Sequence, residues 1–188
     1  GERGSFVRID MEDATCVDDT LALYRTLRGA GLDNVGIVLQ SCLKRTHTDI
    51  AELRDLRPGV RLCKGIYAEP SSIAFQDPDV VRRSFVSCLE MLIEGSSRVA
   101  IATHDEHLIR ESLQRVAALP REAYEFQMLL GVRESRATEL VETGHPVRVY
   151  VPFGRQWYEY SLRRLQENPR MAGVIAKATL GRAVGRDG

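Results

Sequence analysis

Short apolar runs alternate along the chain with longer segments in which apolar residues recur every three or four positions. The short runs are rich in Val, Ile, Leu and Phe, as buried strands of parallel sheets are. They predict strands at residues 6–9, 35–39, 60–64, 99–103, 124–130 and 147–151. The longer segments predict helices near residues 17–30, 48–56, 79–94, 106–118 and 136–142. This alternation predicts an α/β fold with a parallel sheet and helical crossovers.

Two further helices are expected near residues 155–166 and 170–183, separated by Glu167-Asn168-Pro169. No linker or low-complexity tract interrupts the sequence, so we expect a single domain over residues 1–188. Six strand–helix units in 188 residues suit an open, doubly wound sheet. A (β/α)8 barrel usually takes about 250 residues. Periodicity alone therefore favours the open sheet.

Composition and charge exclude several classes of protein. The chain has 26 Lys and Arg residues against 26 Asp and Glu residues, which argues against binding to nucleic acid or to anionic lipid. Four widely spaced cysteines form no C-x-x-C pair, so a disulfide framework or a zinc knuckle is not expected. Neither a signal peptide nor an apolar run of about 18 residues is present in the sequence. These features predict a soluble cytoplasmic protein with reduced thiols.

Polar residues gather directly after the predicted strands. They are Asp10, Glu12 and Asp13 after the first strand, Gln40 after the second, residues 64–69 after the third, and Thr103, His104 and Asp105 after the fourth. Glu125, Gln127, Gly131, Tyr150, Pro152 and Gly154 lie within or after the last two strands. The carboxyl ends of strands are where α/β proteins place their active sites. We therefore expect the active site at this edge of the sheet.

Two classes of cofactor site can be tested by motif. Neither G-x-G-x-x-G nor G-x-x-x-x-G-K-[ST] follows a strand, which disfavours a Rossmann dinucleotide site and a P-loop. The run His104-Asp105-Glu106-His107, together with Asp10 and Glu12, could be read as a set of metal ligands. The two histidines, however, lie at a strand-to-helix corner and not at i, i+4 on one helical face. A metal site is therefore not predicted.

The first of the two C-terminal helices carries an aromatic and basic cluster. Tyr160 lies three and four positions before Arg163 and Arg164, so the three side chains can share a helical face. Glu167 follows at the same spacing and could hold one guanidinium in place. Two arginines beside a tyrosine suit bidentate capture of a small carboxylate, with an aromatic wall for the apolar remainder.

Taken in order, these segments resemble the proline dehydrogenase (proline oxidase) family. Residues 61–69 (R-L-C-K-G-I-Y-A-E) are similar to the family stretch R-L-x-K-G-A-Y-x-E. Further similar blocks are residues 9–12, 38–40, 102–105, 125–131, 148–154 and 157–169. Ile66 stands where the family usually has alanine, and Phe153 where it usually has tyrosine. The blocks run from Asp10 to Pro169 and so cover nearly the whole chain.

The resemblance implies a different architecture from the one that periodicity favours. The family fold is a distorted (β/α)8 TIM-type barrel that holds FAD non-covalently, with the last barrel helix over the strand ends. Residues 1–188 would then be an FAD-binding barrel domain with about six of the eight β/α units. The first two strands, and a substrate-binding lysine on the first of them, would be absent. The resemblance therefore implies either a fragment or a protein completed by another N-terminal segment.

The family activity is oxidation of L-proline to 1-pyrroline-5-carboxylate, with hydride transfer to flavin N5 and electron transfer to a membrane quinone. The resemblance implies these partners, and with them peripheral association with the inner membrane. A variant acting on hydroxyproline is conceivable, but Tyr150 crowds the far side of the ring and favours proline.

Site residues follow from the matched positions. The implied cofactor-binding residues are Met11, Gln40, Arg61, Lys64, Gly65, Ile66, Thr103 and His104. The implied substrate-binding residues are Leu129, Tyr150, Tyr160, Arg163 and Arg164. Arg61 would stabilise negative charge on the reduced flavin, and Asp10, also counted as catalytic, would orient Arg163 or a neighbouring group. Two alternatives stay open: a metal-dependent barrel hydrolase or aldolase using Asp10, Glu12, His104 and His107, and an inactive remnant that serves as an interaction module.

Overall fold

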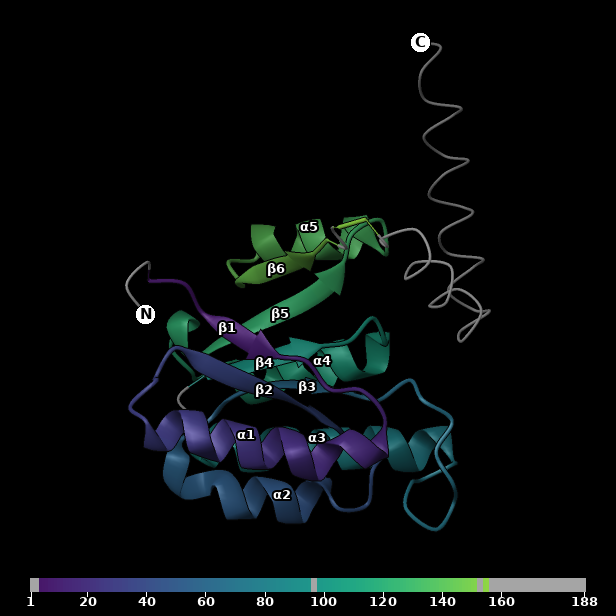
Figure 1. Ribbon diagram of the computed structural model, residues 1–188. Helices are drawn as coiled ribbons and strands as arrows, with labels where there is room; N and C mark the ends of the chain where they lie inside the picture. The colour runs from purple at the N-terminus through teal and green to yellow at the C-terminus, as the bar shows by residue number, and fades with distance from the viewer. Residues whose placement is uncertain (1–3, 96–97, 152–153, 156–188) are drawn as a thin grey trace. The chain divides into compact units, whose positions relative to one another are not determined.

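A computed structural model describes residues 4–95, 98–151 and 154–155 (Figure 1). The strands in this part of the chain are β1 (Val7–Ile9), β2 (Val35–Gln40), β3 (Gly59–Cys63), β4 (Arg98–Ala102), β5 (Tyr124–Leu129) and β6 (Val147–Tyr150). The α-helices are α1 (Val17–Gly29), α2 (Thr46–Leu53), α3 (Pro78–Gly95), α4 (Glu106–Val116) and α5 (Glu134–Glu142). Short 3-10 helices are η1 (Ala14–Cys16), η2 (Arg54–Leu56) and η3 (Arg121–Ala123). The predicted strands and first five helices are confirmed to within a few residues, and the two C-terminal helices lie outside the described residues.

The strand order corrects the prediction of an open, doubly wound sheet. The six strands follow one another in the sheet as β1-β2-β3-β4-β5-β6. The pairs β1–β2, β2–β3 and β3–β4 are parallel, with Ile9 opposite Ile37 and Ile37 opposite Val60. A doubly wound sheet reverses its strand order at a switch point, whereas a (β/α)8 barrel adds every strand on the same side. The consecutive order is therefore of the barrel type, and the prediction from periodicity alone was wrong.

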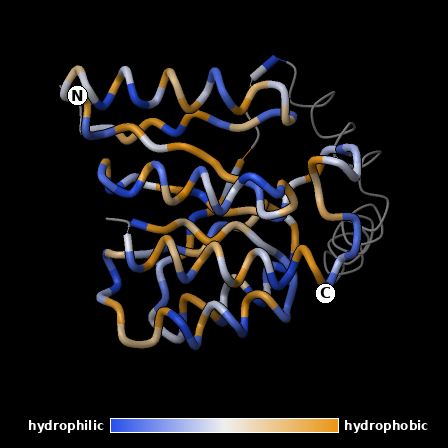
Figure 2. Tube along the Cα trace, turned by 90° about the horizontal axis from the view of Figure 1, so that it is seen from below, coloured by the Kyte–Doolittle hydropathy of each residue, from blue (hydrophilic) through white to orange (hydrophobic). Residues whose placement is uncertain are grey.

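The chain forms two compact units, one over Gly1–Phe126 and the other over Gln127–Gly188. The first unit contains β1 to β4 with α1 to α4, and the second contains the end of β5 followed by α5 and β6. Figure 2 shows hydrophobic residues along the strands, whereas hydrophobic and hydrophilic residues alternate along the helices. Within the described residues, no helix combines the length and the apolar character needed to cross a bilayer.

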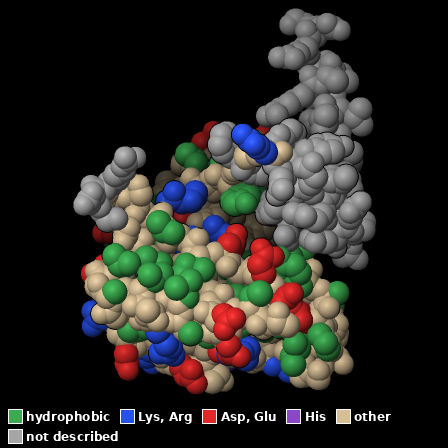
Figure 3. All heavy atoms as spheres, viewed as in Figure 1, with side chains coloured by type: hydrophobic (Ala, Val, Ile, Leu, Met, Phe, Trp, Pro, Cys, Tyr) green, Lys and Arg blue, Asp and Glu red, His purple; other side chains and the backbone are tan. Residues whose placement is uncertain are grey.

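The core of the first unit lies between the sheet and its helices. The strand side chains that face the helices are fully buried, among them Ile37, Val60, Leu62 and Ile101. They pack against apolar helix residues that include Tyr24, Phe85 and Leu89. Over α1, α2 and α3 basic and acidic side chains are interspersed, in keeping with the zero net charge of the chain (Figure 3).

The opposite face of the sheet, turned away from the helices, carries polar residues of the first unit that could take part in binding or catalysis. Because side chains alternate along a strand, Arg61 lies on the other face from its buried neighbours Val60 and Leu62. Gln40, at the end of β2, pairs in register with Cys63 at the end of β3. Arg61 and Gln40 therefore share a face, with Gln40 nearer to the carboxyl edge.

Candidate functional site

Asp10 and Arg61 form an ion pair on the face of the sheet turned away from the helices. Asp10 directly follows β1, and its Oδ1 lies 3.1 Å from Nη1 of Arg61 on β3. The same oxygen accepts a hydrogen bond of 3.1 Å from the backbone N–H of Met11. The Arg61 side chain is 19% exposed and that of Asp10 is 55% exposed, so the arginine is the more enclosed partner. The structure thus brings together the two residues expected to be catalytic.

Gln40 is buried and ties the segment after β1 to the end of β2. Its side-chain Nε2 donates a 2.7 Å hydrogen bond to the carbonyl oxygen of Glu12. The backbone carbonyl oxygen of Gln40 accepts a 2.6 Å hydrogen bond from Oγ1 of Thr46, at the start of α2. With 3% of its surface exposed, the residue is held on both sides. A group bound at this edge would therefore meet a fixed amide.

The turn after β3 requires a glycine at position 65. Gly65 has a φ of +99°, which other residues rarely adopt. A Cβ at this position would lie 2.3 Å from Sγ of Cys42 and 3.0 Å from Oε1 of Gln40. The backbone N–H of Cys42 donates to the carbonyl oxygen of Lys64 at 2.8 Å, which continues the ladder between β2 and β3. The chain therefore passes directly over Cys42 and Gln40, and Ile66 follows it with partial exposure.

Cys42 fills this space as a packing group. Burial, helped by the nearby Glu69 carboxylate, raises the pKa of the Cys42 thiol to about 11. The thiol is therefore protonated at neutral pH and is a poor nucleophile.

Lys64 belongs to a small ionic network at the start of α4. Its Nζ lies 3.2 Å from Oδ2 of Asp105, and Nε of Arg82 lies 2.9 Å from the same oxygen. The other oxygen of Asp105 accepts the backbone N–H of His107 at 3.1 Å and caps the helix. Burial opposes ionisation of Asp105, but the hydrogen bonds from Arg82 and Lys64 outweigh it and lower the pKa of this carboxyl.

Thr103 and His104 form the turn that leads into the same helix. Thr103 is buried, and its Oγ1 accepts a 3.1 Å hydrogen bond from the backbone N–H of Asp105. His104 is partly exposed beside it. Two cationic side chains and a hydroxyl thus lie at one corner of the site around the Asp105 carboxylate, which takes Lys64, Arg82 and the N–H of His107. Two cations against one carboxylate leave a net positive charge, which suits an anionic group.

Sequence reasoning placed Asp105 among the strand-end residues but gave it no role in the site, although an Asp directly before an amphipathic run is a common N-cap. It missed Arg82, which is one of several charged residues on α3 and is brought to Asp105 only by tertiary packing.

Tyr67 and Glu69 on the loop after β3 reach back to the segment after β1. The Tyr67 hydroxyl is hydrogen-bonded to a carboxylate oxygen of Glu12. Oε1 of Glu69 accepts a 2.7 Å hydrogen bond from the backbone N–H of Ala14. The loops after β1 and β3 are therefore joined at two points.

The residues expected to bind substrate belong to the second unit. Leu129 ends β5 and Tyr150 ends β6, and both are partly exposed. The two strands are joined here, because the N–H of Leu130 donates to the carbonyl oxygen of Tyr150 at 3.0 Å. Tyr160, Arg163 and Arg164 lie outside the described residues.

One structural observation concerns the possible metal ligands. Within residues 4–95, 98–151 and 154–155, no three His, Cys, Asp or Glu side chains gather in a way that could hold a metal ion.

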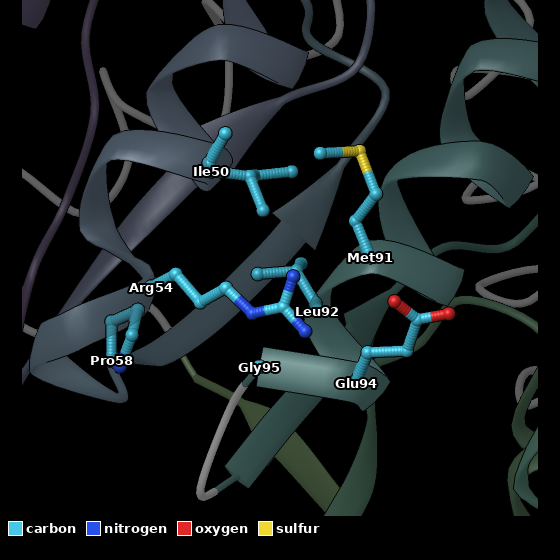
Figure 4. Close-up of a pocket in the computed structure, with 8 residues that line it drawn as sticks. Ile50, Arg54, Pro58, Met91, Leu92, Glu94 and Gly95 are labelled. Atoms are coloured by element: carbon cyan, nitrogen blue, oxygen red, sulfur yellow. The ribbon is translucent and has the colours of Figure 1, made fainter.

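A pocket of about 200 Å³ lies between α2 and α3 (Figure 4). It is lined by Ile50, Ala51, Arg54, Pro58, Met91, Leu92, Glu94 and Gly95. Pro58 precedes β3 and Gly95 ends α3, so the pocket lies at the amino ends of the strands. It contains none of the predicted site residues.

Comparison with known proteins agrees with the sequence resemblance. A family model described as Proline dehydrogenase matches residues 1–177. A curated proline dehydrogenase of Deinococcus radiodurans is 42% identical over 182 residues, which are 95% of this chain and 59% of that protein. Proline dehydrogenase 1 of Bacillus subtilis is 39% identical over 176 residues, or 93% of this chain and 58% of that protein. The chain thus spans somewhat more than half the length of these relatives.

The solved structures point to the same fold. The crystal structure of proline utilization A (PutA) from Bdellovibrio bacteriovorus, inactivated by N-propargylglycine, superposes with a TM-score of 0.80 at 26% identity. The match covers 89% of this chain and 20% of that one. A structure of PutA with proline bound in remote sites gives a TM-score of 0.77 at 24% identity, covering 91% of this chain and 20% of that one.

Proposed function

Because the chain belongs to the proline dehydrogenase family, we propose that it contributes the flavin side of an enzyme that oxidises L-proline to 1-pyrroline-5-carboxylate. The observation that carries this proposal is the Asp10–Arg61 ion pair on the open face of the sheet, beside Gln40 and the turn at Gly65. The chain covers 59% of the Deinococcus relative, so the proposal concerns the whole protein to which these residues belong.

The residues at the carboxyl edge fit FAD chiefly by their charge. Gly65 lets the turn after β3 lie directly against Cys42 and Gln40, since a Cβ there would lie 2.3 Å from Sγ of Cys42. Lys64 and Arg82, with the first turn of α4, would hold the diphosphate, while Thr103 and His104 would lie beside it. Gln40 would hydrogen-bond the edge of the isoalloxazine ring, near Met11 and Ile66. When bound, FAD supplies the hydride acceptor of the reaction.

Arg61 has an electrostatic role in this proposal. A guanidinium held beside the flavin ring stabilises the negative charge that develops on the ring during reduction. Arg61 is mostly enclosed, so its charge is only weakly screened by water. Asp10 fixes the direction of the guanidinium and offsets part of its charge. The pair therefore sets how strongly reduction is favoured.

The second unit supplies the substrate residues. Leu129 and Tyr150 would pack against the proline ring, with Tyr160 as a further wall. Arg163 and Arg164 would bind the proline carboxylate through paired hydrogen bonds. We propose in addition that electrons leave to a quinone at the inner membrane, with the protein on the cytoplasmic side. The family resemblance supports this last step.

The test is a visible absorption spectrum of the chain with FAD, recorded before and after anaerobic L-proline. We expect a bound-flavin spectrum that L-proline bleaches, and the same spectrum without bleaching when D-proline is added instead. A parallel sample extended to the length of the curated relatives shows whether the described strands suffice. If neither sample is bleached, the proposed activity is wrong and the chain is better described as an interaction module.

A further inference from the structure

The segment from Asp10 to Ala14 is held by four contacts with later parts of the first unit. Asp10 pairs with Arg61 at 3.1 Å, and the Glu12 carbonyl accepts the Gln40 side chain at 2.7 Å. The Glu12 carboxylate bonds to Tyr67, and the N–H of Ala14 donates to Glu69 at 2.7 Å. Two of these contacts come from Arg61 on β3 and Gln40 on β2, which the proposed flavin site already uses. The other two come from Tyr67 and Glu69 on the loop after β3, and only that of Glu69 is made to the backbone of the segment.

Glu69 satisfies a backbone donor that the segment cannot satisfy itself. Ala14 begins η1, and the first N–H groups of any helix lack a partner within the helix. Asp13 caps the next N–H, that of Thr15, at 3.0 Å, which leaves the N–H of Ala14 to a residue 55 positions away. Glu69 is itself fixed, because Nε2 of Gln76 donates to its carbonyl oxygen at 3.1 Å.

We propose that Glu69 is a positioning residue, which clasps the N–H of Ala14 and thereby holds Asp10 against Arg61. The effect on flavin reduction rests on the proposed function, whereas the clasp itself rests only on the hydrogen bond between Glu69 and Ala14. The Asp10 side chain is 55% exposed, and ion pairs with so exposed a partner are weak on their own. The geometry of the pair therefore depends on a fixed backbone at both ends. β3 fixes Arg61, and the clasped segment fixes Asp10.

Loss of the clasp has a predictable electrostatic result. When the segment loosens, Asp10 moves into water and no longer offsets the charge of Arg61. A more positive Arg61 stabilises the reduced, anionic flavin further, so the flavin midpoint potential rises. The same release lowers the precision of the reacting geometry, and kcat/KM for L-proline falls roughly 10- to 100-fold.

The experiment compares Glu69→Ala with Glu69→Gln. Gln keeps the Oε1 acceptor without the charge, whereas Ala removes the acceptor, so only Ala should break the clasp. Hydrogen–deuterium exchange of residues 10–16 is measured in the chain without FAD, and the flavin potential is measured after loading with FAD. Glu52→Ala is the matched control, because Glu52 is exposed on α2 and pairs only weakly with Arg25 at 3.6 Å. Thermal unfolding confirms that each variant is folded.

We expect faster exchange and a raised potential in Glu69→Ala, with Glu69→Gln and the control close to wild type. Asp10→Asn should raise the potential in the same direction without faster exchange. Unchanged exchange in Glu69→Ala would refute the clasp, and faster exchange with an unchanged potential would refute the positioning role. If L-proline bleached neither the wild-type chain nor the sample extended to the length of the relatives, only the proposed function would be contradicted, since exchange of the FAD-free chain tests the clasp separately.

Discussion

At the scale of the residue, Gly65 decides whether the turn after β3 can form. We predict that Gly65→Ala destabilises the chain by about 1–3 kcal/mol more than Gly31→Ala does. Both glycines have positive φ, but nothing lies within 4 Å of a Cβ at Gly31, whereas Cys42 lies at 2.3 Å from one at Gly65. Urea denaturation of the two variants measures the difference. Cys42→Ala added to Gly65→Ala should recover part of the loss, and equal effects of the two single variants would contradict the steric argument.

Asp105 gives a second prediction at the same scale. Because its pKa is lowered in the folded chain, Asp105 contributes stability above its ordinary pKa of 3.8, and this is lost as pH falls through the folded value. The stability difference between wild type and Asp105→Asn should therefore be constant near neutral pH and shrink below about pH 4. Urea denaturation at a series of pH values checks this. Asp18→Asn is a control at an exposed ion pair. The stability difference between wild type and this variant should change less with pH than the difference for Asp105→Asn.

At the scale of the element, α3 holds the first unit together. Leu89 is fully buried on this helix, whereas Leu23 on α1 is 49% exposed. Replacing a buried leucine by alanine removes apolar burial and leaves a cavity, so we expect Leu89→Ala to cost about 2–5 kcal/mol. Leu23→Ala should cost well under half of that. A small effect of Leu89→Ala in thermal and urea unfolding would mean that the helix does not pack as described.

The elements were predictable from the sequence, but their arrangement was not. Buried strands and amphipathic helices leave a periodic pattern, so β2 and α3 were found from their own residues. Strand order leaves no such pattern, so periodicity alone favours an open sheet, and only the family resemblance predicts the barrel order. Contacts such as Arg82 with Asp105 and Glu69 with Ala14 join residues 23 and 55 positions apart. A single sequence shows which residues can form such contacts and cannot show which of them meet.

At the scale of the whole molecule, the predicted roles divide between the two compact units. All predicted cofactor residues, from Met11 to His104, lie in the unit over Gly1–Phe126. All predicted substrate residues, from Leu129 to Arg164, lie in the unit over Gln127–Gly188. Each half of the reaction thus draws on a different stretch of chain. Substitutions in one unit should then affect one ligand and leave the affinity for the other nearly unchanged.

Arg163→Met tests this division. Loss of a charged hydrogen-bonding partner should raise the KM for L-proline roughly 100-fold, while the Kd for FAD stays within about twofold of wild type. Lys64→Met should instead raise the Kd for FAD and leave the KM for L-proline nearly unchanged. Lys64 lies at the proposed diphosphate corner and has no proposed contact with proline. Arg110→Met, at an exposed position on α4, is the matched control for loss of an arginine. Steady-state kinetics and FAD titration measure both constants for each variant. If Arg163→Met weakened the binding of FAD as much as the binding of proline, the two sites would be coupled and the division of roles would be wrong.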